Sequence, residues 1–147
     1  MDLYTPDQND FQELANLWER SVRATHDFLP DTYIATLKDL LFTHYLGSVT
    51  LFCTRDEQLN ITGFAGVSRY KLEMLFIAPE QRGQGQGKQL LEHAIAHFHI
   101  SELDVNEQNP QALGFYLKHG FEIIHRSELD GLGHPYPILR MRLPSRE

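Results

Sequence analysis

The chain of 147 residues is 41% hydrophobic and 22% charged, with a formal net charge of −7, which is typical of one globular domain with a substantial core. The acidic balance argues against DNA or RNA as a partner, because proteins that bind nucleic acids usually present a basic face. A single cysteine, the lack of an apolar run near the ~20 residues of a membrane span, and an N-terminus unlike a signal peptide indicate a cytoplasmic protein without disulfides or a membrane partner.

The N-terminal segment predicts a short strand followed by a helix. Residues 2–4 are the candidate strand. Thr5 is the expected N-cap of the helix, with Pro6 at its first position and Gln8 completing a capping box. Apolar residues recur on one helical face, so we expect this helix to run to about Ala24.

The next part of the chain predicts a helix and three strands. The helix opens at Pro30 and stops at Gly47. The β-branched and aromatic segments 49–55, 61–68 and 71–77 follow as strands, separated by short polar turns. Strands so spaced form an antiparallel meander.

Glycine occupies every second position after the third of these strands. Gly83, Gly85 and Gly87 lead from the strand, through a turn, into an amphipathic helix. Glycine permits positive φ and a close approach of ligand to backbone, and a helix start offers unpaired N–H groups to phosphate. The letters fit neither known phosphate motif: Gln89 stands where a P-loop has serine or threonine, and Lys88 and Leu90 stand where the dinucleotide fingerprint would need its third glycine. The glycine spacing alone leaves two other possibilities: a different kind of nucleotide-phosphate site, or a turn that binds no ligand.

The last third of the chain continues the alternation of helices and strands. A strand over 101–105 is followed by a short helix over 111–118, then by strands over 121–128 and 136–143. The predicted order is β-α-α-β-β-β-α-β-α-β-β. This order predicts a mixed α/β sheet with helices on its faces in one domain, 1–147.

Two motifs carry a family resemblance. The segment Arg82-Gly83-Gln84-Gly85-Gln86-Gly87, after a strand ending in Phe-Ile-Ala-Pro, resembles the acetyl-CoA loop of the GCN5-related N-acetyltransferases (GNAT). Residues 109–121 are similar to the second signature of that family, N-x-x-A-x-x-F-Y-x-K-x-G-F. The resemblance covers nearly the whole chain. It implies a largely antiparallel sheet of six to seven strands, splayed between the strands at 71–77 and 101–105.

The resemblance also implies how acetyl-CoA is held as co-substrate. Backbone N–H groups of the glycine loop are expected to bind the pyrophosphate, and the strand before the loop is expected to bond the pantetheine arm as an added strand would. An N–H near Leu75 is the expected oxyanion donor. The expected cofactor-binding residues are Leu75, Phe76, Ile77, Arg82, Gly83, Gln84, Gly85, Gly87, Lys88, Asn109 and Tyr116.

The implied reaction is acetyl transfer to a primary amine of a small molecule or of a peptide or protein N-terminus, by direct attack in a ternary complex. Tyr116 matches the family's general acid, which protonates the leaving thiolate. Glu73 is the first candidate for the base that deprotonates the ammonium, in an apolar strand that would raise its pKa. His26 is the second candidate, and a water chain is a third possibility.

Ordinary structural roles compete with several of these assignments. Asn109 and Tyr116 are seven residues apart on one helix and can line the same side of a cofactor, about 10 Å apart. Asn109 is equally suited to cap the helix, Tyr116 to fill the core, and Glu73 to face outward. Cys53 is expected to be buried and inert.

Alternatives to an enzyme also remain. A catalytically weak acyl-CoA-binding sensor or interaction module would carry the same motifs. His93 and His97 have the i,i+4 spacing of helical zinc sites, but we expect them in solvent without a third ligand, and so no metal. The expected partners are acetyl-CoA and an amine acceptor that the sequence does not identify, with the chain as monomer or homodimer.

Overall fold

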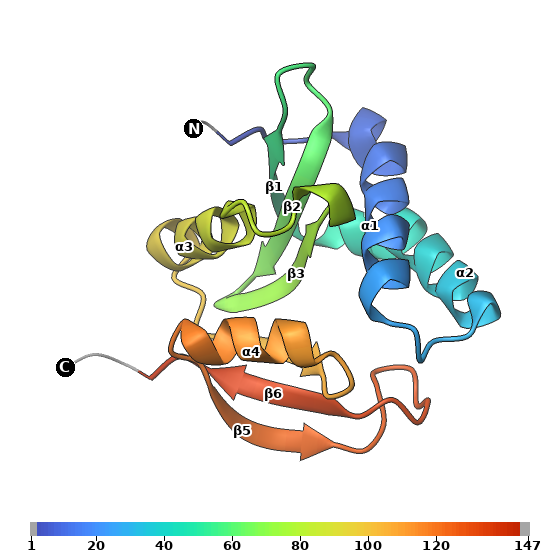
Figure 1. The fold of residues 1–147 in the computed structure, drawn as a ribbon, viewed down its shortest axis with the longest axis vertical. Coiled ribbons are helices and arrows are strands. Elements are labelled where there is room, and N and C mark those ends of the chain that lie inside the picture. Colours follow the sequence, from blue (N-terminus) through green and yellow to red (C-terminus); the bar gives the residue numbers. More distant parts are fainter. Residues whose placement is uncertain (1–2, 145–147) are drawn as a thin grey trace. The chain divides into compact units, whose positions relative to one another are not determined.

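The computed structural model describes residues 3–144, whose contacts group into two compact units, Met1–Ile100 and Ser101–Glu147 (Figure 1). Each unit combines antiparallel strands with helices, so the chain is of the mixed α/β class that the sequence predicts. Residues 3 and 4, the described part of the strand predicted over 2–4, do not form a strand. Tyr4 makes only an isolated antiparallel bridge with Cys53, and Asp2 lies outside the described residues.

The first helix begins later than predicted. A 3-10 turn, η1 (Gln8–Asp10), precedes α1 (Phe11–Thr25). The cap is Asp7 and not Thr5: Asp7 Oδ1 accepts the N–H of Asn9, and the Asp10 carboxylate accepts the N–H of Asp7. The predicted capping box therefore exists two residues further along, because the 3-10 turn places Asp10 at the position three residues after the cap.

The second helical segment stays helical as predicted but changes its winding. Helix α2 (Asp31–Leu40) passes into a π turn, η2 (Leu41–Tyr45), and a 3-10 turn, η3 (Leu46–Ser48). The N–H of Leu46 donates to the carbonyl of Leu41, five residues before it. Both leucines are buried, and this wider turn brings residues five apart to the same face.

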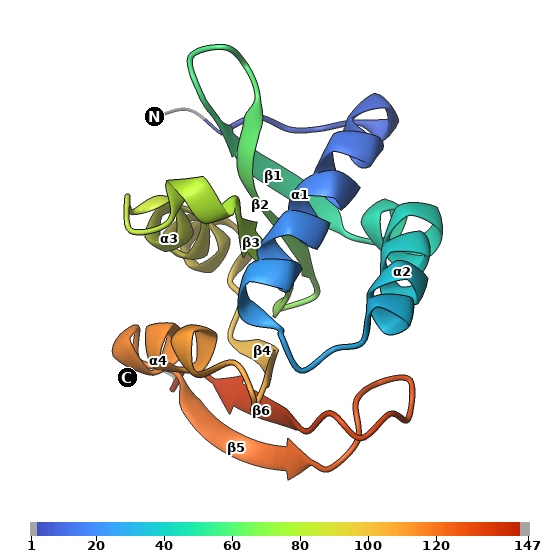
Figure 2. The ribbon, with the colours of Figure 1, turned by 45° about the vertical axis from the view of Figure 1, so that its right-hand side comes forward.

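The first unit contains the predicted antiparallel meander. Strand β1 (Thr50–Arg55) pairs with β2 (Ile61–Ser68), which pairs with β3 (Lys71–Ile77). Seven of the eight residues of β2 are buried, since α1 packs against one face of these strands and α3 (Gln86–Phe98) against the other (Figure 2). The core of this unit lies between α1 and the sheet, around Leu14, Trp18 and Phe64.

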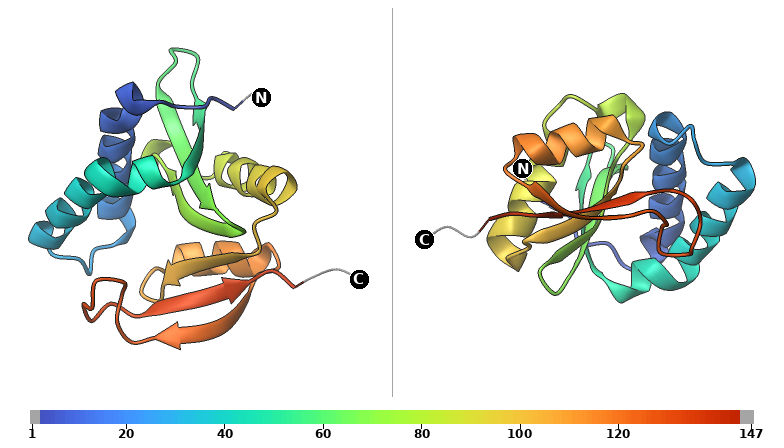
Figure 3. Two further views of the ribbon diagram at one scale, coloured as in Figure 1. Left: turned by 180° about the vertical axis from the view of Figure 1, so that it is seen from behind. Right: turned by 90° about the horizontal axis from the view of Figure 1, so that it is seen from below.

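The second unit is a three-stranded antiparallel sheet with one helix. Its middle strand β6 (Ile138–Arg142) pairs on one side with β4 (Glu102–Asn106) and on the other with β5 (Glu122–Ser127). Helix α4 (Pro110–Lys118) packs beside β4 (Figure 3). All four predicted elements are present within two residues of their expected bounds. The splay expected between the strands at 71–77 and 101–105 involves both units and stays a prediction.

None of the helices formed by residues 3–144 is both long and apolar enough to cross a membrane.

Candidate functional site

The glycine loop connects β3 to α3 through the 3-10 turn η4 (Pro79–Gln81). Gly83 and Gly85 adopt φ of 79° and 82°, a conformation that residues with a Cβ rarely take. A Cβ on either would have no atom within 4 Å, so backbone conformation and not lack of space requires glycine here. Gly87, by contrast, lies in the first turn of α3 with ordinary helical geometry.

The loop presents a run of unpaired donors. Among residues 3–144 we find no acceptor for the six consecutive backbone N–H groups from Gly83 to Lys88. The first helical bond of α3 is donated by Gln89 to the carbonyl of Gly85, and no side chain caps the helix. Arg82 differs from the expectation, because its N–H donates to the carbonyl of Pro79 at 3.4 Å. Six donors and the positive end of a helix dipole give this segment, 83–88, the features that anions prefer at a helix start.

Side chains attach the start of this loop to the end of α1. The Arg82 guanidinium donates to the carbonyl and the hydroxyl oxygen of Ser21, both at 3.2 Å. Arg20 and Glu80 form an ion pair at 2.8 Å. The loop motif predicted a role for Arg82 but not for buried Ser21. The one feature of the sequence that could have indicated Ser21 is its position three residues after Trp18, on the apolar face of the helix.

His26 ends α1 and is buried, with 7% of its surface exposed. Its Nδ1 lies 2.8 Å from the Thr25 hydroxyl, and its ring packs against Phe28 at 5.3 Å between centroids. Burial lowers the pKa of His26. The backbone hydrogen bond with Val22 opposes this shift in part, and the nearby cation of Arg82 adds a smaller lowering. A neutral imidazole at neutral pH fits the second candidate for the base.

This burial predicts an acid-sensitive stability. An exposed histidine of the unfolded chain titrates near pH ~6.5, whereas buried His26 accepts a proton only at lower pH. The unfolded state therefore binds more protons below about pH 6.5, and the free energy of unfolding falls as the pH is lowered. We expect His26→Asn to flatten the slope of stability against pH between 5 and 7 in urea unfolding. Equal slopes for both proteins would show that His26 is protonated equally in the two states.

Strand β3 carries a bulge at Glu73. In the pairing with β2, Met74 lies opposite Gly66 and Leu72 opposite Val67, so Glu73 has no partner residue. A bulge turns a side chain away from the regular alternation of the strand. Glu73 accepts a hydrogen bond from the Ser68 hydroxyl at 2.5 Å and lies 3.4 Å from the Lys71 ammonium. It is exposed, so the apolar surroundings expected for this candidate base are absent.

The strand before the loop directs part of its backbone away from β2. The N–H of Ala78 donates to Thr62 of β2. Because successive N–H groups of a strand point to opposite edges, Leu75 and Ile77 direct their N–H and C=O groups away from β2. These are two of the three residues expected to bond the pantetheine arm, and Leu75 is the expected oxyanion donor. Phe76, between them, packs against Trp18 and Phe64.

In the second unit, α4 carries Asn109 at its start and Tyr116 two turns later. The Asn109 side chain accepts the N–H of Ala112 at 3.3 Å and is buried, so its alternative role as a helix cap is confirmed. Pro110 then occupies the first helical position, where its missing N–H costs nothing.

The capping bond of Asn109 should contribute to the stability of the chain. Asn109→Ala should lower the free energy of unfolding by about 1 kcal/mol, whereas Asn109→Asp keeps a capping oxygen and should cost less. Thermal unfolding of both variants measures this difference. If Asn109→Asp is as unstable as Asn109→Ala, the capping bond is not what Asn109 contributes.

Tyr116 is 8% exposed and packs edge-on against Phe115 and Phe121. Burial raises its pKa, so the hydroxyl stays protonated at neutral pH. No hydrogen-bond partner of this hydroxyl occurs among residues 3–144, and no fully buried side-chain oxygen there lacks a partner. The hydroxyl oxygen therefore retains contact with solvent, and its proton is free for a ligand.

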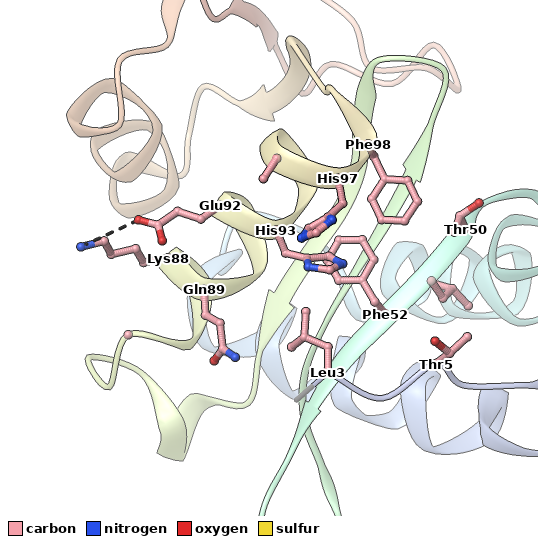
Figure 4. Close-up of a pocket in the computed structure, with 13 residues that line it drawn as sticks. Leu3, Thr5, Thr50, Phe52, Lys88, Gln89, Glu92, His93, His97 and Phe98 are labelled. Atoms are coloured by element: carbon pink, nitrogen blue, oxygen red, sulfur yellow. Dashed lines mark ion pairs between the residues drawn. The ribbon is translucent and has the colours of Figure 1, made fainter. Parts of the chain in front are cut away.

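The outer face of α3 lines an open pocket of about 850 Å³ with β1 (Figure 4). We predicted that His93 lies in solvent, but it is half-buried. The centroid of its ring is 4.7 Å from that of Phe52 and 4.3 Å from that of His97. Burial and the neighbouring His97 lower the pKa of His93. Among residues 3–144 no group of three or more His, Cys, Asp or Glu side chains is placed to hold a metal.

Cys53 is buried, as expected. Its thiol donates to the carbonyl of Tyr4 at 3.4 Å, and burial raises its pKa to about 12. A thiol held protonated in the core is not a nucleophile at neutral pH.

Comparisons with known proteins agree with this geometry. Residues 28–141 match the Acetyltransferase (GNAT) domain family. The peptidyl-lysine N-acetyltransferase YjaB of Salmonella typhimurium is 44% identical over 133 residues, which cover 90% of this chain and 91% of that protein. The solution structure of the apo form of YjaB from Escherichia coli has a TM-score of 0.88 at 39% identity and covers 99% of this chain and 98% of its own.

A more distant structure shares the fold. The PaiA N-acetyltransferase of Thermoplasma acidophilum, solved in complex with coenzyme A, has a TM-score of 0.69 at 19% identity and covers 96% of this chain and 98% of its own. These matches define an acetyl-CoA-dependent acyltransferase that acts on an amine. The chain belongs to the GNAT family of N-acetyltransferases.

Proposed function

We propose that this chain transfers the acetyl group of acetyl-CoA to the side-chain amine of lysine in peptides or proteins. The observation that carries the proposal is the run of six unpaired N–H groups, 83–88, at the uncapped start of α3. The lysine acceptor is supported by the 44% identity to proteins named for that activity in Salmonella typhimurium and Escherichia coli. A lysine acceptor goes beyond the expectation from the sequence, which named only a primary amine of a small molecule or of a peptide or protein N-terminus.

The proposed roles divide among the residues described above. The N–H groups of 83–88 bind the pyrophosphate, and the backbone of Leu75 and Ile77 bonds the pantetheine arm. The Leu75 N–H donates to the carbonyl oxygen as negative charge develops there. The thioester supplies the activated acetyl group. Tyr116 gives its proton to the sulfur as the C–S bond breaks.

The acceptor must lose a proton before its nitrogen can form the new C–N bond, since a lysine ammonium has a pKa near 10.4. We propose Glu73, His26 or a water chain for this step. Glu73 has an exposed carboxylate on a bulge, and an exposed carboxylate can also attract a cationic lysine. His26 is neutral near pH 7 but buried.

We further propose that residues 1–147 act as one catalytic domain in the cytoplasm, as monomer or homodimer, without a metal or a nucleic-acid partner. The match to one solved chain over 99% of the sequence supports the single domain. The net charge of −7 supports a basic acceptor over a nucleic acid.

A thiol-release assay with acetyl-CoA tests the acceptor. The matched substrates are a peptide with a blocked N-terminus and one free lysine, the same peptide with acetyl-lysine, and a lysine-free peptide with a free N-terminus. We expect release only with the free lysine. Release with the free N-terminus or with polyamines alone would contradict the lysine proposal. Saturable binding of acetyl-CoA with no transfer to any of these amines would instead support the sensor alternative.

A further inference from the structure

The start of α3 lacks the features that usually stabilise a helix start. Its N-cap, Gly85, is in the left-handed region and offers no side-chain cap, and Gly87 follows two residues later. A glycine within a helix, such as Gly87, is less favourable than alanine because it gives up more backbone freedom on folding. A capping side chain would occupy the N–H groups that a phosphate needs. The helix start must therefore be held by contacts that leave these N–H groups open.

Such contacts exist behind the loop, through the side chain of Gln86. Its Oε1 accepts a hydrogen bond from the Thr54 hydroxyl of β1 at 3.0 Å. Its Nε2 donates to Oε1 of Gln81 at 3.3 Å, which closes the loop across its two ends. Thr54 is fully buried, and its hydroxyl lies 3.0 Å from that of Thr62 on β2. The four side chains form a continuous chain of hydrogen bonds from the sheet to the first residue of α3.

The hydrogen-bonding capacity of the threonines fits this chain. A hydroxyl donates one proton and can accept at the same time. Thr62 can donate to Thr54 while Thr54 donates to Gln86 at 3.0 Å, the nearer of its two acceptors; the other, the Gly63 carbonyl, lies at 3.4 Å. All of these bonds involve side chains, so the N–H groups of Gln86, Gly87 and Lys88 stay open.

We propose that Thr54 is a positioning residue for acetyl-CoA, which acts through Gln86 to hold the unpaired N–H groups of 83–88 in the arrangement that binds the pyrophosphate. This inference rests on the proposed function. Thr54 itself touches neither the cofactor nor the acceptor in this scheme. Its loss should weaken cofactor binding and leave the later chemical step almost unchanged.

The test compares Thr54→Val, Thr54→Ser and Gln86→Leu with the wild-type chain. Valine keeps the volume of threonine but cannot donate, whereas serine keeps the hydroxyl. One hydrogen bond of this kind corresponds to about a 2- to 13-fold effect. We expect Thr54→Val to raise the KM for acetyl-CoA and the Kd for coenzyme A 3- to 10-fold, with kcat and the acceptor KM within twofold. Thr54→Ser should restore binding to within about twofold.

A double-mutant cycle shows whether the effect passes through Gln86. Thr54→Val with Gln86→Leu should bind coenzyme A no more weakly than the weaker single variant, because both changes remove the same Thr54–Gln86 bond. Thr43→Val is the control, since its hydroxyl, in η2, donates to the Asp39 carbonyl of α2 and to no other group among residues 3–144. If Thr54→Val fails to fold, Gln86→Leu alone must show the same rise in Kd.

Two results would overturn the inference. One is unchanged binding in Thr54→Val or Gln86→Leu while the wild-type chain binds coenzyme A; the other is fully additive effects in the double variant. If the wild-type chain itself does not bind coenzyme A, the proposed function fails first, which a calorimetric titration of that protein decides separately.

Discussion

Tyr116→Phe should lower kcat at least tenfold while the Kd for coenzyme A changes less than about twofold. The hydroxyl has no partner among the described residues, and burial keeps it protonated. Phenylalanine removes the proton donor but keeps the ring that packs against Phe115 and Phe121. Without that proton the thiolate must leave as an anion, and general-acid catalysis typically contributes 10²- to 10⁴-fold. Steady-state kinetics with saturating acetyl-CoA measure the effect.

A control variant removes a tyrosine hydroxyl elsewhere in the chain. Tyr45→Phe removes an exposed tyrosine hydroxyl in η2 and should leave kcat unchanged. Thermal unfolding of both variants should differ little from the wild-type chain. If Tyr116→Phe keeps full turnover, Tyr116 is a core aromatic and the sulfur is protonated by another group or by water.

Gly85→Ala should raise the Kd for coenzyme A tenfold or more. Gly85 has φ of 82°, where a Cβ costs about 1–2 kcal/mol. This strain destabilises the folded chain, and the loop relieves it in part by turning its N–H groups away from the phosphate. We therefore expect the melting temperature to fall by roughly 3–6 °C, together with the loss of binding.

Gly47→Ala is the control for the same chemical change. It introduces a methyl group into open space at a residue without positive φ, so neither stability nor binding should change appreciably. Calorimetric titration with coenzyme A compares the two variants. Binding by Gly85→Ala as tight as that of the wild-type chain would mean that the left-handed conformation of Gly85 does not shape the phosphate site.

The features that the sequence predicted correctly depend on local patterns. The strands over 50–55, 61–68 and 71–77 follow from runs of β-branched and aromatic residues, and the glycine loop from its spacing. The open N–H groups of the loop follow from the same glycines, since Gly85 starts α3 without a capping side chain. The capping box shows the limit of such patterns: Asp7 and Asp10 form it because a 3-10 turn, invisible in the letters, precedes α1.

The features that the sequence missed depend on tertiary contacts. The helical pattern placed His93 opposite the apolar stripe and therefore in solvent. In the structure the ring of Phe52, from β1, packs edge-on against the His93 ring. Thr54 reads as an ordinary strand residue, and only the packing of α3 on β1 brings its hydroxyl to Gln86. For Glu73 the sequence left two possibilities, a carboxylate in apolar surroundings and one that faces outward. The structure has the second, at a bulge that the sequence did not predict. Which residue acts as base therefore stays a prediction.

The measurement that tests the central claim most directly is an amide NMR titration of the ¹⁵N-labelled chain with coenzyme A. The N–H groups of 83–88 have no acceptor among residues 3–144, and binding of a pyrophosphate would give them one. We predict saturable shifts that are largest for these six amides. Two results would contradict the account. One is saturable shifts at other amides while these six do not shift, and the other is no binding of coenzyme A at all.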